Sequence, residues 1–329
     1  MRLAMASPFL LWAHVKKWRP VRVLLASSLS MACDSMELKG IFVPNVTPFT
    51  HHGEIDSGAL NGLIDFWLDA GVSGLVVNAS TGEAPLLSAE ERKDLINLVK
   101  EKMGSRGKVI AGTGAIGTRE TIQFTRDARD AGAEAALVAS PWFFRPSDEE
   151  IFQHFASLIS SVDLPVILYN VPKFTGYSVP PGVVDRIADE CSNLVGIKDS
   201  GGSPGNMAEN IRLFGGKISV LSGAADMTMP TLVMGGKGAI LAVANAVPEA
   251  CVKLYHAVVR GDLEEAGRLQ LKVSYVNKVL VREHSQIAAV KAALKSLGRP
   301  AGVPRRPLRP LPVDEERHVV EAFKLAESL

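Results

Sequence analysis

From residue 36 onward, the chain repeats a short apolar run, a few small or polar residues, and a longer amphipathic stretch. Each apolar run is nearly continuous, as expected for a strand that is buried on both faces of a parallel sheet. The runs are Ile41–Val46, Gly74–Asn78, Val109–Gly112, Ala135–Ala139, Val166–Tyr169, Leu194–Ile197, Ile218–Leu221 and Ala239–Val243. The pattern therefore predicts eight strands separated by helices.

The stretches between these runs carry helical periodicity and helix-start signals. In the segment 58–70, apolar residues recur three and four positions apart, which places them on one face of a helix. Ser88 with Glu91, and Ser147 with Glu150, have the spacing of a capping box. Strands and helices that alternate with short connections indicate parallel strands and right-handed crossovers. Eight such units favour closure into a (β/α)₈ TIM barrel.

After the eighth run the pattern becomes purely helical. Further helices are expected at 249–260, 263–281, 285–297 and 313–328. The Pro-rich stretch 299–312 predicts an extended strap over the surface. We therefore expect one domain over residues 36–329, with the barrel at 36–247 and a helical C-terminal extension at 248–329.

Residues 1–35 differ from the rest of the chain. They contain five of its 36 Lys and Arg residues but one of its 35 Asp and Glu residues. A basic, acid-poor leader is typical of a targeting segment. We favour translation that starts at Met36, because the folded pattern begins directly after it, and a disordered extension or a targeting signal is the alternative. Its apolar runs are short and broken by Lys16, Lys17 and Pro20, so they do not predict a membrane-spanning helix.

Composition and charge narrow the function classes. The net charge of +1 implies no strong field for nucleic acid. With 6% aromatic residues, the core must be mainly aliphatic, which suits a barrel interior. Cys33, Cys191 and Cys251 are too few and too scattered for a disulfide framework or a zinc site. We expect a cytoplasmic enzyme with reduced thiols and no membrane or nucleic-acid partner.

Candidate chemistry is sought at the carboxyl ends of the strands, where barrel active sites lie. Lys198 ends the sixth run, and a buried, uncharged amine there can attack a ketone to form an imine. Alternatively, this lysine reaches out to solvent or pairs with Asp199. Tyr169 ends the fifth run and can move protons, or it is simply a core tyrosine. The Ser80–Gly82 turn can bind a carboxylate or merely cap a loop, with Glu83 holding it in place.

Five collinear segments resemble the dihydrodipicolinate synthase / N-acetylneuraminate lyase superfamily of class I aldolases. They are Gly40–Phe49, Ser80–Glu83, Tyr169–Pro172, Gly196–Ser200 and Gly235–Ile240. The resemblance extends from about Met36 to the C-terminus. It implies a (β/α)₈ lyase that forms a Schiff base with a 2-oxo acid.

The resemblance also implies roles for individual residues. Lys198 resembles the Schiff-base lysine, and Tyr169 resembles the proton donor and acceptor beside it. Ser80 and Thr81 resemble the pair that binds the carboxylate of the 2-oxo acid, with Ser80 also relaying a proton. Ile240 resembles a residue whose backbone contacts the substrate. The family acts on pyruvate and an aldehyde, needs no metal or organic cofactor, and commonly forms homotetramers.

Two positions depart from the synthase branch of this family. That branch has a second tyrosine in the loop after strand four, which completes a proton relay across a subunit contact. Phe143 stands there and has no hydroxyl. An arginine that binds a carboxylate is replaced by Phe174, which cannot donate a hydrogen bond. Together with Trp142, these residues predict an apolar pocket wall.

The leading hypothesis is a Schiff-base aldolase that cleaves or forms a carbon–carbon bond between pyruvate and an aldehyde. The segments Asp199–Gly202 and Ala244–Asn245 resemble the branch that acts on 4-hydroxy-2-oxoglutarate or 2-keto-3-deoxy sugar acids. The alternative is 4-hydroxy-tetrahydrodipicolinate synthase with an altered proton relay. A hypothesis of another class is a non-catalytic barrel that binds a 2-oxo acid, because Phe143 lacks the relay hydroxyl.

Overall fold

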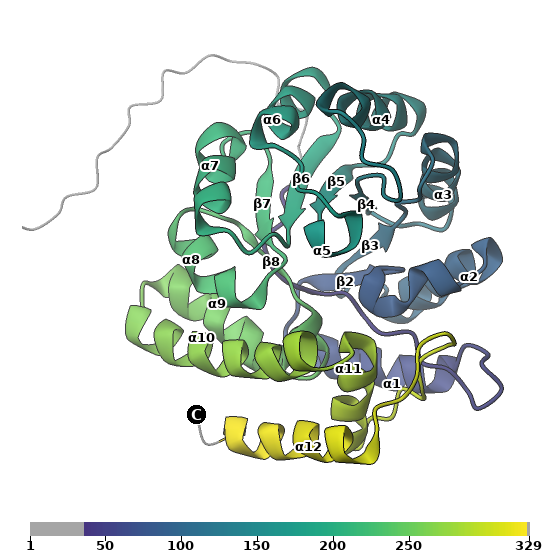
Figure 1. Ribbon diagram of the computed structural model, residues 1–329, viewed down its shortest axis with the longest axis vertical. Helices are drawn as coiled ribbons and strands as arrows, with labels where there is room; N and C mark the ends of the chain where they lie inside the picture. Colours follow the sequence, from purple (N-terminus) through teal and green to yellow (C-terminus); the bar gives the residue numbers. More distant parts are fainter. Residues whose placement is uncertain (1–35, 328–329) are drawn as a thin grey trace, which may run out of the picture. The chain divides into compact units, whose positions relative to one another are not determined.

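A closed barrel of eight parallel strands forms the centre of the computed structural model, which describes residues 36–327 (Figure 1). Strands that follow one another in sequence are neighbours in the barrel, and β1 closes the ring by pairing with β8. The strands are β1 (Gly40–Val43), β2 (Gly74–Val77), β3 (Lys108–Gly112), β4 (Ala135–Ala139), β5 (Val166–Asn170), β6 (Leu194–Asp199), β7 (Ser219–Ser222) and β8 (Gly238–Ile240). The predicted (β/α)₈ barrel is therefore confirmed.

Helices cover the outside of this barrel (Figure 1). They are α1 (Ser57–Asp69), α2 (Ala89–Met103), α3 (Thr118–Asp130), α4 (Asp148–Ser161), α6 (Pro181–Glu190), α7 (Pro204–Phe214), α8 (Thr228–Val233) and α9 (Pro248–Arg260). Short helical turns at strand ends are η1 (Ser80–Gly82), η2 (Ala84–Leu86), α5 (Pro172–Thr175), η3 (Ala225–Met227) and η4 (Ala242–Asn245). Both predicted capping boxes are present, at Ser88 before α2 and at Ser147 before α4.

The first and last strands end earlier than predicted. Pro44 follows β1 and has no N–H for a further ladder bond. The Asn245 side chain takes over at this point, because its amide donates to Pro44 O and its carbonyl accepts from the Val46 N–H, both at 3.0 Å. A side chain far along the sequence therefore joins the ends of β1 and β8.

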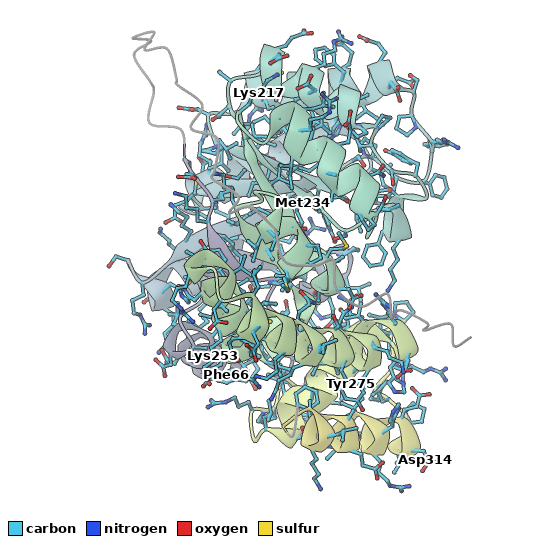
Figure 2. The ribbon with its side chains drawn as sticks, turned by 90° about the vertical axis from the view of Figure 1, so that its left-hand side faces the viewer. Phe66, Lys217, Met234, Lys253, Tyr275 and Asp314 are labelled. Carbon is cyan, nitrogen blue, oxygen red and sulfur yellow. The ribbon has the colours of Figure 1, made fainter. Side chains whose placement is uncertain are left out.

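The C-terminal extension packs against one side of the barrel as α10 (Leu263–Asn277), α11 (Gln286–Ser296) and α12 (Val313–Glu327). In both views, α10 and α12 lie in successive rows (Figures 1 and 2). The predicted helix at 263–281 changes to π-helix after α10, in η5 (Lys278–Glu283). The strap 299–312 contains neither helix nor strand, as predicted. The described residues, 36–327, belong to one compact unit.

Successive residues along each strand alternate between two apolar clusters. Phe42, Val76 and Ile110 belong to the cluster inside the barrel. Their strand neighbours, such as Leu75 and Val77, belong to the larger cluster between strands and helices. Because the interior is filled with side chains, a substrate must bind at the carboxyl end of the strands.

Some expectations concern residues that the structure does not describe. The leader 1–35 and Cys33 lie outside the described residues. Within the described part, Cys191 and Cys251 are buried free thiols. No helix found between residues 36 and 327 has the length and apolar character to cross a membrane. The expected cytoplasmic location stays a prediction.

Candidate active site

Lys198 and Tyr169 lie together at the carboxyl end of the barrel. They are paired in register on β6 and β5, so the sheet itself brings their side chains to one face. Lys198 is 3% exposed and Tyr169 is 7% exposed. The Lys198 Nζ lies 4.1 Å from the centre of the Tyr169 ring. The amine and the phenol are therefore close neighbours in a largely dry environment.

Asp199 does not neutralise Lys198, although it is the next residue in the chain. Its Oδ1 accepts hydrogen bonds from the Asn170 side chain at 2.9 Å and from the Gly201 N–H at 2.8 Å. Its Oδ2 accepts from the Asn210 side chain at 3.0 Å. Within residues 36–327, no carboxylate forms an ion pair with Lys198. This buried amine neither reaches solvent nor pairs with Asp199, which leaves it available for chemistry.

Gly223, which follows β7, makes room for the lysine side chain. A Cβ at this position would lie 2.1 Å from Ser200 Oγ, 3.0 Å from Lys198 Cε and 3.1 Å from Lys198 Cγ, closer than such atoms normally approach. The Gly223 N–H also donates to Asp199 O at 2.7 Å, which fixes the glycine against β6. Sequence reasoning gave this residue no role, although a glycine directly after a strand is a signal of close packing.

The Ser80–Thr81 turn forms η1 at the end of β2. Thr81 is 2% exposed, and its Oγ1 accepts a hydrogen bond from the Gln286 side chain at 3.1 Å. The Thr47 hydroxyl donates to Gly82 O at 2.7 Å, which ties the turn to the loop after β1. Ser80 is only half-buried. Hydrogen bonds from neighbouring segments therefore fix the turn, while the Ser80 side chain stays partly exposed.

A cavity of about 760 Å³ lies at this end of the barrel. Tyr169, Ser80, Trp142 and Phe174 are among the residues that line it. Lys198, Thr81 and Ile240 are not among the lining residues, and all three are at most 3% exposed. The Lys198 amine lies against the ring of Tyr169, and Tyr169 itself lines the cavity.

Phe143 differs from the other aromatic residues of the expected wall. It is 81% exposed and is not among the residues that line the cavity. Its φ of +79° is strained for a residue with a side chain, and the ring turns outward against Phe144. Trp142 and Phe174 are thus the parts of the expected apolar wall that face the cavity.

Sequence reasoning missed a buried charged pair beneath the turn. Lys291 of α11 is 2% exposed, and its Nζ lies 2.8 Å from Glu83 Oε1. Burial lowers the pKa of Lys291, and the nearby Glu83 carboxylate partly offsets this effect. The signal was present, because Lys291 stands on the apolar face of α11, three residues from Ala288 and from Leu294. Within the described part of the chain, no cluster of His, Cys, Asp or Glu is arranged to hold a metal ion.

A sequence model of the Dihydrodipicolinate synthetase family matches residues 37–326. The chain belongs to the dihydrodipicolinate synthetase family. Relatives named 4-hydroxy-tetrahydrodipicolinate synthase come from Methanothrix thermoacetophila and Methanocaldococcus jannaschii. Each is 38% identical; the first match covers 84% of this chain and 93% of the relative, and the second covers 82% and 92%. The resemblance found in the sequence is thereby confirmed.

Solved structures of the dihydrodipicolinate synthetase family have the same fold. Dihydrodipicolinate synthase from Thermotoga maritima is 31% identical and covers 89% of this chain and 100% of that one, with a TM-score of 0.86. A prophage protein of the family from E. coli K12, solved in complex with pyruvate, is 32% identical and covers 88% and 98%, with a TM-score of 0.85. Proteins of this family are aldolase-type lyases, so the chain is a carbon–carbon lyase.

Proposed function

We propose that this lyase joins or separates pyruvate and an aldehyde through a Schiff base on Lys198. The observation that carries the proposal is the buried Lys198 amine without a carboxylate partner, 4.1 Å from the centre of the Tyr169 ring. A lysine without a neutralising partner in a dry site is suited to act as a nucleophile. The relative from E. coli K12 that was solved with pyruvate supports the choice of 2-oxo acid.

In the proposed reaction, the Lys198 amine attacks the keto carbon of the 2-oxo acid, and water leaves as the imine forms. The Tyr169 hydroxyl donates and accepts the protons of this step, with Ser80 as relay. The hydroxyl on C4 of the bound 2-oxo acid then gives its proton to Tyr169 as the C3–C4 bond breaks. The electron pair of that bond passes to the protonated imine, which becomes an enamine, and the aldehyde is released. The resulting enamine takes up a proton, and hydrolysis frees pyruvate and Lys198. The reverse sequence forms the bond.

The substrate carboxylate is assigned to the Ser80–Thr81 turn. Because Thr81 Oγ1 already accepts a hydrogen bond from Gln286, its own proton remains available for a carboxylate oxygen. The backbone of Ile240, at the end of β8, is assigned a further contact to the substrate. The protein's own amine serves as the electron sink, so this scheme includes no metal or organic cofactor.

Phe143 and Phe174 decide which aldehyde is proposed. Phe174 offers no donor for a second carboxylate, and the cavity wall that it shares with Trp142 is apolar. This wall favours a 2-keto-3-deoxy sugar acid, which has a single carboxylate. The resemblance of Asp199–Gly202 and Ala244–Asn245 keeps 4-hydroxy-2-oxoglutarate in the proposed substrate class. The names of the relatives favour the second candidate, 4-hydroxy-tetrahydrodipicolinate synthase with an altered proton relay. A barrel that binds a 2-oxo acid without turnover is the remaining hypothesis.

Borohydride reduction in the presence of pyruvate tests the step that both enzyme candidates share. We expect a stable mass increase on Lys198, and its loss in Lys198→Ala. The matched control is Lys173→Ala, because Lys173 also follows a strand but lies in α5. An unmodified Lys198 in the wild-type chain rejects the proposal. Pyruvate release from a panel of 2-oxo acids, compared with condensation of aspartate semialdehyde, separates the two enzymes; imine formation without either activity indicates the binding barrel.

Assembly as a homotetramer is part of the proposal. The exposed Phe143 and Phe144 rings are 5.1 Å apart, and together they present an apolar surface that a second copy would cover. Sedimentation of the full chain tests this, and a monomer at all concentrations would reject it.

A further inference from the structure

Glu83 directly follows the Ser80–Gly82 turn and is held from the opposite end of the chain. It has a left-handed φ of +61°, and its carboxylate is buried. Oε1 forms the ion pair with Lys291 of α11, and Oε2 accepts a hydrogen bond from the Arg305 N–H of the strap at 2.8 Å. Both oxygens of this one side chain therefore bind the C-terminal extension.

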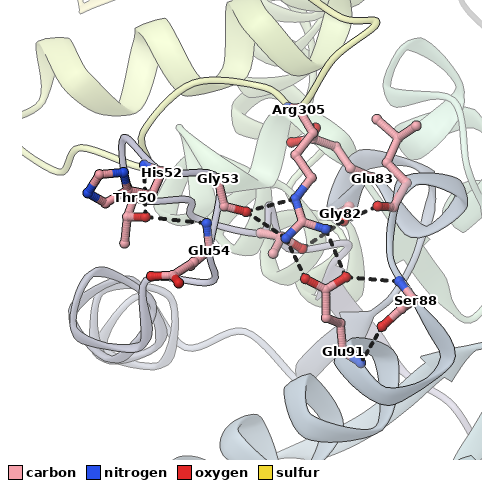
Figure 3. A network of polar contacts seen from close by, with 11 residues as sticks. Thr50, His52, Gly53, Glu54, Gly82, Glu83, Ser88, Glu91 and Arg305 are labelled. Carbon is pink, nitrogen blue, oxygen red and sulfur yellow. Dashed lines mark hydrogen bonds and ion pairs between the residues drawn. The ribbon is translucent and has the colours of Figure 1, made fainter.

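The Arg305 guanidinium fixes the segments on either side of the turn. It donates to Gly53 O in the loop after β1, to Leu86 O in η2 at 3.1 Å, and to the Glu91 carboxylate at the start of α2 (Figure 3). The Phe49 ring lies against two cations, 4.4 Å from Lys291 Nζ and 4.3 Å from the Arg305 guanidinium carbon. The Arg305 side chain thus binds backbone carbonyls of two segments, the loop after β1 and η2.

Gln286, at the start of α11, reaches the turn itself. Its side-chain amide donates to Thr81 Oγ1, as described above. A hydroxyl whose oxygen accepts one hydrogen bond must direct its proton elsewhere. Gln286 therefore sets the direction in which Thr81 can donate.

Stability alone does not account for the buried pair. Apolar residues of similar volume often replace a buried ion pair without loss of stability, because removing two charges from water is costly. Here the pair lies next to the turn assigned to the substrate carboxylate, and three donors from the extension converge on Thr81 and Glu83. These contacts join that turn to the C-terminal extension.

We propose that Lys291, the Arg305 N–H and Gln286 are positioning groups by which the C-terminal extension completes the carboxylate-binding site. This inference rests on the proposed function, since it assumes that the Ser80–Thr81 turn receives the carboxylate of a 2-oxo acid. It implies that the chain after residue 285 controls substrate selection at the barrel, although none of these groups contacts the reacting carbon.

The test compares two ketones that differ in the carboxylate. Borohydride trapping on Lys198 is measured with pyruvate and with acetone, in the wild-type chain and in Lys291→Met. We expect the pyruvate trapping rate at low concentration to fall about tenfold or more, with the acetone rate within about twofold of wild type. The matched control is Lys295→Met, on the same helix but exposed and paired with Glu316, which should leave both rates unchanged.

A second variant guards against misfolding of Lys291→Met. Gln286→Leu leaves the Glu83–Lys291 pair intact and should lower the pyruvate rate by a smaller factor, again without affecting acetone. Equal losses for both ketones, or no loss for either, in the folded variants would overturn the inference. In that case a normal wild-type adduct on Lys198 would still support the proposed function. Absence of that adduct would reject the proposed function and the inference together.

Discussion

The two sides of the cavity floor are positioned by different parts of the chain. Lys198 and Tyr169 lie on adjacent strands, and the register of β5 and β6 alone brings them together. The Ser80–Thr81 turn depends on contacts that span about two-thirds of the chain, including Gln286 to Thr81 at a separation of 205 residues and Arg305 to Glu83 at 222. We call Lys198 and Tyr169 the strand side of the site, and Ser80 and Thr81 the turn side.

This difference suggests a division of labour. Strand register is difficult to alter without unfolding the barrel, so the strand side suits the groups that make and break bonds. A turn held by a later segment can change with that segment while the barrel stays the same. Changes on the strand side should therefore affect the rate of chemistry, and changes on the turn side should affect the binding of the 2-oxo acid.

Removing the Tyr169 hydroxyl should give the largest effect among these predictions. In Tyr169→Phe the ring beside Lys198 remains, but the proton donor is lost, so pyruvate release should fall by about 10²–10³-fold. Steady-state kinetics would measure the change, with Tyr255→Phe as the control because Tyr255 lies on α9, away from the site. A variant that retains wild-type turnover would show that the strand side does not depend on this hydroxyl.

Acid should destabilise the folded chain through His154 on α4, the helix between β4 and β5 that carry the strand side. Burial lowers the pKa of His154 to about 4, whereas an unfolded histidine titrates near 6.5. Between these values the unfolded chain binds more protons, so the unfolding free energy falls as the pH decreases from 6.5 toward 4. The total loss should be about 3 kcal/mol.

Urea titrations across this pH range would measure the effect of His154. His154→Gln should flatten the pH dependence relative to wild type, while the exposed His256 gives a matched His256→Gln control that should not. If the unfolding free energy depended on pH identically in all three proteins, His154 would not be the source of the acid destabilisation.

Crowding Lys198 without removing any chemical group should give a smaller effect. In Gly223→Ala the new methyl group would displace the Ser200 hydroxyl and press on Lys198 Cε and Cγ, so imine formation should slow by about tenfold. Gly216→Ala is the control, because its Cβ would meet no atom within 4 Å. Stopped-flow trapping with pyruvate would measure both, and equal rates would mean that the lysine has room to move.

The exposed Phe143 side chain should matter least for imine formation. Because Phe143 is 81% exposed, the hydroxyl in Phe143→Tyr projects away from Lys198, and pyruvate trapping should change by less than about twofold. The same variant should be assayed for condensation with aspartate semialdehyde, the step that the altered relay concerns. A tenfold change in the rate of pyruvate trapping would show that Phe143 acts close to Lys198, contrary to its exposed position.

Much of the strand side was predictable because its signals are local. Near-continuous apolar runs predict buried strands, and a lysine or tyrosine at the end of such a run must face the carboxyl end of the barrel. The capping boxes at Ser88 and Ser147 depend on residues three positions apart, so they too were found from sequence. The π-helix after Asn277 was missed, because its apolar periodicity is close to that of an ordinary helix.

The order of strands and helices, and the pairing of Lys198 with Tyr169, follow from the sequence by itself, since each rests on periodicity over a few residues and on the closure of eight units. Three features were decided only in the tertiary structure: the outward rotation of Phe143, the space for Lys198 at Gly223, and the hold of Lys291 and Arg305 on Glu83. Each depends on atoms brought together from distant positions. The sequence position of a charged residue does not identify its ion-pair partner, because only folding brings the two side chains together.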